Sequence, residues 1–103
     1  MATEYQHESC RLVKKLRNLL EAYAASGWKL KSVTMGDMMT RYELVFERCE
    51  SGTQEYIYAH ACCRRKKKLN KILAEYAQDG WELAFQIMSD MGTRYDAIFV
   101  KSK

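Results

Sequence analysis

Cationic side chains gather at two places where the sequence predicts that a helix begins. Arg11, Lys14 and Lys15 stand at i, i+3 and i+4 spacing, which places them on one helical face. Cations at a helix start oppose the helix dipole and cost about 0.3–1 kcal/mol each when exposed. Unpaired backbone N–H groups and a cationic fork can together bind an anion; the alternative is a solvated basic face. The predicted anion-binding residues of both clusters, with two strand-start arginines, are Arg11, Lys14, Lys15, Arg41, Arg64, Lys67, Lys68 and Arg94.

A pair of turns rich in methionine and aspartate is the second candidate. The segments 35–42 and 88–95 agree at six positions, although several expected core positions differ between the same two regions. Exposed methionines would form an adaptable contact surface for a partner protein. The alternative is a turn stabilised by its aspartate, with the methionines packed against the helix. The predicted partner-contact residues are Met35, Asp37, Met38, Met88, Asp90 and Met91.

A His-x-x-Cys pattern occurs twice, as His7 with Cys10 and as His60 with Cys63. Two such pairs could supply a Cys₂His₂ zinc tetrahedron if they met. A cysteine at a helix start beside a histidine could also serve as a nucleophile. The spacing is not one of the usual zinc-finger patterns, however, and no third catalytic group is identifiable. We therefore predict no metal, no cofactor and no enzymatic activity.

These clusters recur because the chain is an internal duplication. Between Tyr5 and Arg48, 20 of 44 positions carry the same residue as the position 53 further along the chain. A copy of about 50 residues is marginal for an independent core, so we expect the copies to share one. The sequence predicts a single domain over residues 1–103, built of repeat 1–50, repeat 54–103 and the linker 51–53.

Each copy reads as strand, helix, strand, strand. Apolar residues recur at three- and four-residue spacing from Leu12 to Ala24 and from Leu69 to Ala77, which predicts amphipathic helices. Gly27 and Gly80 stand just past these helices, where a left-handed residue ends a helix. The predicted strands are Glu4–Glu8, Arg41–Glu47, Glu55–Ala59 and Arg94–Val100, with a further strand opened by each of Trp28 and Trp81.

This order of elements brings the candidate side chains to one pole of each copy. The helix start, the Met and Asp turn and the start of the last strand should lie together, with His7 and Cys10 in the first copy. The predicted architecture is α+β: two tandem βαββ repeats with pseudo-two-fold symmetry and antiparallel sheets packed with two helices. The sheets should either join edge to edge or pack face to face. Trp28 and Trp81 are expected to be buried at equivalent sites at the opposite pole.

The Gly-Trp motif that follows each helix resembles a known group. Gly80-Trp81-Glu82-Leu83 and Gly27-Trp28-Lys29-Leu30 are each followed by an aromatic strand that ends in Phe-x-(Arg/Lys). In this the chain is similar to a short bacterial and phage domain-of-unknown-function family with a Gly-Trp-Glu-Leu signature, here in tandem. The resemblance implies a βαββ unit and no assigned chemistry. It also implies that the tandem does alone what a single-unit relative would do as a homodimer.

Composition limits the class of protein further. Residues 1–50 carry eight Lys or Arg against seven Asp or Glu, and residues 51–103 carry nine against six. A mildly basic chain is not a nucleic-acid mimic, which would be acidic. No apolar run approaches the roughly 20 residues of a membrane span, and residues 1–8 are not a secretory signal. We expect a cytoplasmic protein with four reduced cysteines and no membrane partner.

Two classes of function follow from these observations. The first is a non-enzymatic binding module that recognises nucleic acid, a nucleotide signal or an acidic protein surface through its paired basic helix starts. The second is a small phage or mobile-element inhibitor or adaptor that binds a host protein through its Met-rich hairpins. Either would act as a monomer with pseudo-dimeric symmetry or as a homodimer.

Overall fold

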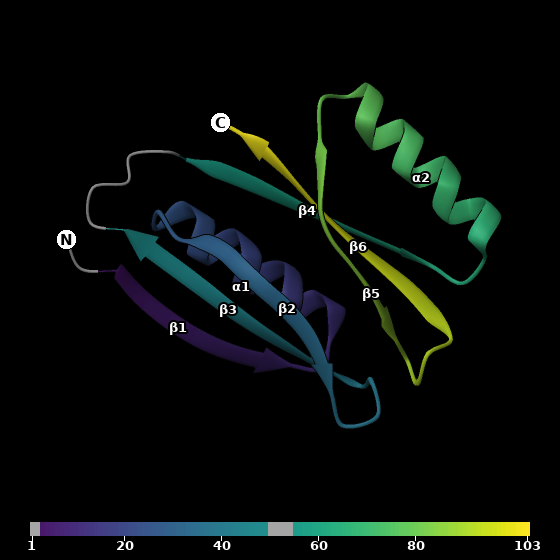
Figure 1. Ribbon diagram of the computed structural model, residues 1–103, viewed down its shortest axis with the longest axis horizontal. Coiled ribbons are helices and arrows are strands. Elements are labelled where there is room, and N and C mark those ends of the chain that lie inside the picture. The colour runs from purple at the N-terminus through teal and green to yellow at the C-terminus, as the bar shows by residue number, and fades with distance from the viewer. Residues whose placement is uncertain (1–2, 50–54) are drawn as a thin grey trace.

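The computed structural model describes residues 3–49 and 55–103, which form two units of one design (Figure 1). In each unit the third strand lies at the centre of a three-stranded antiparallel sheet, in the orders β1-β3-β2 and β4-β6-β5. The predicted α+β class with two βαββ repeats is confirmed. The predicted linker 51–53 lies outside the described residues. The elements are β1 (Thr3–Cys10), α1 (Val13–Ala25), β2 (Lys29–Gly36), β3 (Arg41–Cys49), β4 (Tyr56–Cys63), α2 (Lys66–Gln78), β5 (Glu82–Ser89) and β6 (Arg94–Ser102).

The first strand of each unit is longer than the sequence indicated. β1 continues to Cys10, which pairs with Tyr42, and β4 continues to Cys63, which pairs with Tyr95. The central strand is long enough to pair with these residues, so the strand ends only where the chain must turn into the helix. Neither helix has a side-chain cap at its start, and neither has an acidic residue in its first turn.

Each helix ends at the glycine that the sequence indicated. Gly27 and Gly80 adopt φ of 83° and 86°, in the left-handed region that side chains with a Cβ disfavour. The next residue folds back, so that the N–H of Trp28 donates to the carbonyl of Tyr23 at 2.9 Å. This hydrogen bond satisfies a carbonyl at the helix end and sets the direction of the following strand.

Helix and sheet pack through the same aromatic contact in both units. Tyr23 stacks on Phe46 with ring centroids 4.1 Å apart, and Tyr76 stacks on Phe99 at the same distance. We call the sheet face that carries the unit's own helix the front face, and the opposite face the back face. Because side chains alternate along a strand, Asp96 and Ile98 of the central strand β6 lie on the back face.

The two tryptophans occupy equivalent sites but are only partly buried, which corrects the prediction that both are buried. Trp28 meets Tyr23 edge-on and Trp81 meets Tyr76 edge-on. A cation covers the outer face of each indole ring: Arg48 lies 4.7 Å from the centroid of Trp28, and Lys101 lies 5.4 Å from that of Trp81. Their role is packing at the edge of the core.

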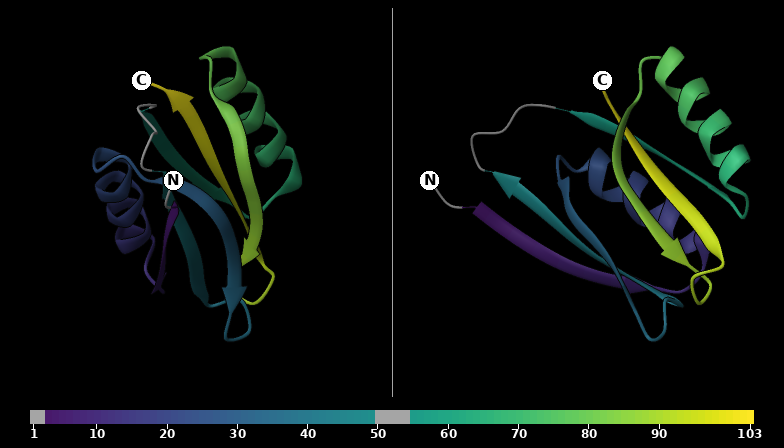
Figure 2. Two further views of the ribbon diagram at one scale, coloured as in Figure 1. Left: turned by 60° about the vertical axis from the view of Figure 1, so that its left-hand side comes forward. Right: turned by 45° about the vertical axis from the view of Figure 1, so that its right-hand side comes forward.

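The units pack face to face as two separate sheets, but they do not use the same surface on each other. α1 and β2 of unit one pack against β4 and β5 of unit two (Figures 1 and 2). Tyr42, on the front of unit one, donates to Asp96, on the back of unit two, at 2.8 Å. A two-fold axis would require α2 to pack along β1 in return, and within the described ranges it does not. The repeat is confirmed, whereas the expected two-fold relation is replaced by front-to-back packing.

Front-to-back packing makes the burial of equivalent residues unequal. Leu30 in unit one is 3% exposed, whereas its counterpart Leu83 in unit two is 46% exposed. Leu20 is buried and its counterpart Leu73 is only half-buried. The hydrophobic core cluster therefore centres on the front of unit one, with Ile98 added from the back of unit two.

Candidate functional site

The arginine before each helix fastens the neighbouring hairpin turn to the helix start. Arg11 lies 2.6 Å from the carboxylate of Asp37 and donates to the hydroxyl of Thr40 at 2.8 Å. In unit two, Arg64 lies 2.7 Å from Asp90 and holds its carboxyl pKa below the ordinary value. The predicted convergence of helix start and turn is confirmed by these contacts. Both arginines already have carboxylate partners inside the chain.

The two strand-start arginines also have internal partners. Arg41 donates to Glu43 at 2.5 Å and lowers the pKa of that carboxyl, while Arg94 donates to Tyr42 at 2.9 Å. Arg94 also lies 3.5 Å from the buried carboxylate of Asp96. Four of the eight predicted anion-binding residues are thus engaged with acidic or hydroxyl groups of the protein.

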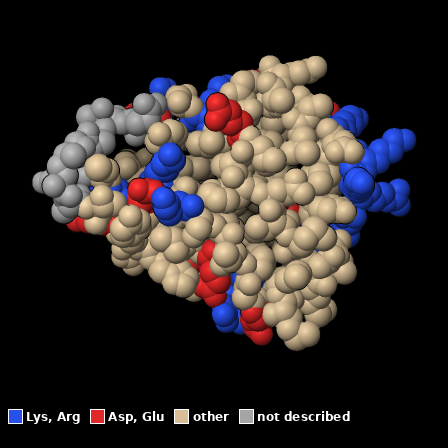
Figure 3. Space-filling model, viewed as in Figure 1, with Lys and Arg blue, Asp and Glu red and all other residues tan. Residues whose placement is uncertain are grey.

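The lysines of both helix starts remain open to a ligand. Lys14 and Lys15 on α1 and Lys67 and Lys68 on α2 are exposed, and within the described part of the chain none of them forms an ion pair. Figure 3 shows Lys and Arg side chains that project from the edge of the molecule where α2 begins. These four lysines are the part of the predicted basic surface that a partner could contact.

Each hairpin turn contains three successive residues with left-handed backbone. In the first turn φ is 49° at Asp37, 57° at Met38 and 64° at Met39; in the second it is 52° at Asp90 and 57° at Met91. For a residue with a Cβ this conformation costs about 1–2 kcal/mol, and only Asp and Asn among the ordinary residues visit it with ease. Two hydrogen bonds from the Thr40 N–H, to the carbonyls of Gly36 and Asp37, close the first turn.

The two turns lie side by side at one end of the molecule (Figure 2). Gly92 of the second turn is so close to the first that a methyl group placed on it would stand 3.7 Å from the Met39 sulfur. Met38 is 77% exposed and Met91 is 64% exposed. Met35 and Met88 are half-buried on the flanking strands instead, so the sequence grouped two different kinds of methionine.

A buried polar cluster joins the two units, and the sequence did not indicate it. Asp96 is completely buried and accepts hydrogen bonds from His60 at 2.6 Å, from the Tyr42 hydroxyl and from Ser89. Arg17 donates to the Nδ1 atom of His60 at 3.3 Å, so the proton on Nε2 is the one shared with Asp96. The available signal was Asp96 itself, a carboxylate that stands among apolar residues of a central strand.

The hydrogen bonds of this cluster set the charge of its members. Burial alone would raise the pKa of Asp96, but the bonds from His60, Ser89 and Tyr42 outweigh burial and hold the pKa below the ordinary carboxyl value. Burial, followed by the bond to Asp96, raises the pKa of Tyr42 to about 12. Both nitrogens of His60 are engaged and its side chain is buried, so the cluster joins the two units.

In neither His-x-x-Cys pair do the histidine and the cysteine lie on the same face of their strand. Because the first strand continues to Cys10, His7 and Cys10 lie three residues apart on a strand and point to opposite faces. Among the described residues, no group of three or more His, Cys, Asp or Glu side chains is placed to hold a metal. Burial raises the pKa of the Cys10 thiol, which disfavours a reactive thiolate.

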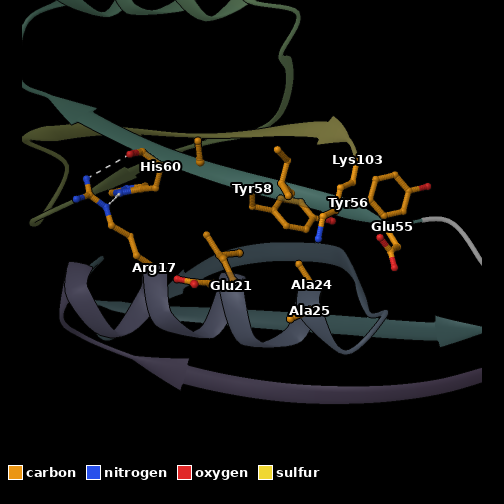
Figure 4. A pocket seen from close by; sticks show the side chains of 12 residues that line it. Arg17, Glu21, Ala24, Ala25, Glu55, Tyr56, Tyr58, His60 and Lys103 are labelled. Atoms are coloured by element: carbon orange, nitrogen blue, oxygen red, sulfur yellow. Dashed lines mark hydrogen bonds between the residues drawn. The ribbon is translucent and has the colours of Figure 1, made fainter.

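A groove of about 670 Å³ lies along the seam between α1 and β4 (Figure 4). Ala24 and Ala25 leave this space because their side chains are small. Arg17 closes one end through His60, and side chains of both charges line the rest, among them Glu21 and Lys103. Because side chains of both signs line the groove, it does not favour a ligand of either charge. We interpret it as a gap in the packing between the two units.

Comparisons with known proteins supply no identity for this arrangement. A scan of protein-family models, a search of curated proteins and a search of solved structures each found no match. The resemblance indicated by the Gly-Trp-Glu-Leu motif therefore stays a prediction. In the described residues, neither helix is long and apolar enough to cross a bilayer.

Proposed function

We propose that the protein is a non-enzymatic binding module that docks on an acidic surface of a partner protein. The docking surface would be its hairpin end, which we define as Met38, Met39 and Met91 of the turns with Leu12 at the start of α1. The free lysines of the two helix starts, Lys14, Lys15, Lys67 and Lys68, would border it. This proposal joins the two sequence-based hypotheses at one surface.

The observation that carries the proposal is the strained backbone that holds methionines in solvent. Met38 and Met91 each occupy a left-handed conformation at about 1–2 kcal/mol, and neither gains burial within the chain in return. Backbone strain of this kind concentrates at functional sites, where the surroundings hold it in place. Arg11 and Arg64 supply that hold, since each binds the aspartate of its turn.

The composition of this end fits a protein partner better than a phosphate backbone. Protein interfaces have an apolar centre enriched in methionine and a polar rim, and here the exposed methionines belong to turns that are held to the lysine-bearing helix starts. A phosphate-binding surface would instead place its arginines outward. Arg11, Arg41, Arg64 and Arg94 all bind groups of their own chain. Leu12, which is 70% exposed, enlarges the apolar centre.

Affinity capture with matched variants tests this function. The immobilised chain is exposed to nuclease-treated lysate, and the bound protein and nucleotide fractions are identified by mass spectrometry. The double variant Met38→Ser/Met91→Ser should lose at least about tenfold of the captured protein, because two hot-spot side chains are removed. Ile57→Ser, which removes an exposed apolar residue of β4, is the matched control and should capture normally.

The lysines provide the second arm of the same experiment. Lys67→Ala/Lys68→Ala should weaken capture more than Lys29→Ala/Lys31→Ala, although both pairs remove the same charge. Lys29 lies over the Tyr56 ring and Lys31 lies 3.6 Å from Glu47, so the control pair is on another surface. A nucleotide fraction whose binding falls steeply with added salt, with capture indifferent to the methionines, would refute the proposal in favour of phosphate recognition.

A further inference from the structure

The two units bind each other through different surfaces, so each unit keeps one surface that the interface does not use. The front of unit one receives the back of unit two, and the two surfaces are different. In a repeat packed this way, no neighbouring unit covers the back of unit one or the part of the front of unit two that α2 leaves free. Because such a head-to-tail contact joins two different surfaces, it can recur from molecule to molecule, in an open chain or a closed ring.

Where α2 leaves it free, the front of unit two keeps two of the contact residues that the front of unit one uses, although Asn70 stands where Arg17 stands. Tyr95 stands where Tyr42 stands in unit one, and Leu83 stands where Leu30 stands. Within the described part of the chain the Tyr95 hydroxyl makes no hydrogen bond, whereas the Tyr42 hydroxyl is bonded to Asp96. Leu83 is among the most exposed large apolar residues of the molecule.

The uncovered back of unit one keeps the polar cluster of the internal interface. His7 lies 2.9 Å from Glu43, which Arg41 also contacts, as His60 and Arg94 contact Asp96 in unit two. Tyr5, which is 60% exposed, stands where Tyr58 accepts a hydrogen bond from the Leu30 N–H at 2.9 Å. This cluster lacks the tyrosine and the arginine that the neighbouring unit supplies to its buried counterpart, and Gly36 stands where Ser89 stands in unit two.

We infer that the front of unit two in one molecule binds the back of unit one in a second copy of this chain. Tyr95 of one copy donates to Glu43 of the other, as Tyr42 donates to Asp96 within the chain. The Leu83 N–H of one copy donates to the Tyr5 hydroxyl of the other. The contact repeats the internal interface, so association proceeds head to tail.

The contact between copies is weaker than the internal one. On the back face, Ser32, Thr34 and Glu47 of unit one replace Phe85, Ile87 and Val100 of unit two. Less apolar surface is therefore removed from water, and the stabilisation falls in proportion to the area. Association is consequently reversible and depends on protein concentration. It uses a different surface from the hairpin end, so either proposal can fail alone.

Analytical ultracentrifugation of complementary variants tests the inference. The native chain should pass from a 12.1 kDa monomer to larger species as its concentration rises. Leu83→Asp disables the front of unit two and Tyr5→Asp disables the back of unit one, so each alone should stay monomeric. Their mixture should form a one-to-one dimer and nothing larger, because each keeps one working surface. Leu12→Asp, at the hairpin end, is the control and should associate like the native chain.

The hydrogen bond to the carboxylate gives a milder second test. Tyr95→Phe should weaken association about 10- to 100-fold, the usual effect of losing a hydrogen bond to a charged group. The inference is overturned if the native chain stays monomeric at every concentration. It is equally overturned if Tyr5→Asp alone still dimerises, which would indicate a two-fold contact of front faces, or if the two variants fail to combine.

Discussion

The back faces of the two units carry the same polar cluster in opposite surroundings. His60 and Asp96 of unit two have side chains with no exposed area, whereas those of His7 and Glu43 of unit one are 61% and 19% exposed. Each histidine contacts its carboxylate, and each carboxylate has an arginine nearby. The difference shows that the neighbours of a polar cluster decide whether it joins two units or meets solvent.

The neighbours differ through a few positions on the flanking strands. Phe85 and Ile87 make the back of β5 apolar, whereas Ser32 and Thr34 make the back of β2 polar. Buried apolar surface stabilises the first arrangement in proportion to its area. In the second arrangement water solvates the polar cluster, so its groups do not lose their hydration as those of the buried cluster do. One sequence pattern thus serves as an internal joint in unit two and as a surface in unit one.

Removal of each of the two carboxylates should give the largest difference in stability between equivalent variants of the two units. Asp96→Ala should lower the free energy of unfolding by about 3–5 kcal/mol, because it leaves the buried His60 and Tyr42 without their acceptor. Glu43→Ala should cost much less, since water replaces its partners. Urea titration of both variants measures the difference, and equal losses would show that the two clusters are not buried differently.

Truncation of equivalent leucines should give the next largest effect. Leu30→Ala removes a side chain that is 3% exposed and should cost about 2–5 kcal/mol. Leu83→Ala acts on the exposed counterpart and should cost less than about 1 kcal/mol, as most surface substitutions do. Both changes are measured by thermal and urea unfolding at a concentration where the chain is monomeric. A larger loss at Leu83 would contradict the front-to-back arrangement.

Acid should destabilise the molecule partly through Asp96. The pKa of this carboxyl is lowered in the folded state, so its contribution to stability is full above the ordinary carboxyl pKa of about 4 and is lost as the pH falls below it. Asp96→Asn should therefore flatten the fall of unfolding free energy in that acid range, whatever its effect at neutral pH. The slope is read from urea titrations at several pH values. An unchanged slope would mean that another carboxyl dominates.

The hairpin turns offer the smallest and most local contrast. Their third left-handed position is Met39 in unit one and Gly92 in unit two. Met39→Gly should raise the free energy of unfolding by up to about 1 kcal/mol, since glycine adopts this conformation without steric cost. Gly92→Ala, at φ of 85°, should lower it by a similar amount. The opposite signs in denaturant titration would sharpen the assignment of strain, and loss of stability in both would refute it.

The repeat in the sequence correctly predicted the fold of each unit, because the signals that define this fold are local. Helix periodicity and a glycine after each helix act locally, so the βαββ order and the helix ends followed from residues such as Gly27. The tie between Arg11 and its turn also followed from chain order. The sequence alone did not separate a cation that binds its own chain, such as Arg94, from one that awaits a ligand, such as Lys67.

The packing of the two units against each other could not be predicted from the repeat, because it depends on contacts between residues that are distant in sequence. An identical pattern in two copies suggested symmetry, whereas the symmetry is broken at the positions where the copies differ. Phe85 and Ile87 were the available signal, since they make β5 apolar on the face that a solvent-exposed sheet would leave polar. Strand alternation beyond the expected end of β1 likewise separated His7 from Cys10.

Front-to-back packing buries one histidine of the chain and exposes the other. The chain has two histidines, so diethyl pyrocarbonate labelling followed by peptide mass spectrometry reads each one separately in a single dilute, neutral sample. We expect rapid modification of His7 and protection of His60 until the protein is unfolded in urea. Equal rates at the two histidines in the folded protein would contradict front-to-back packing.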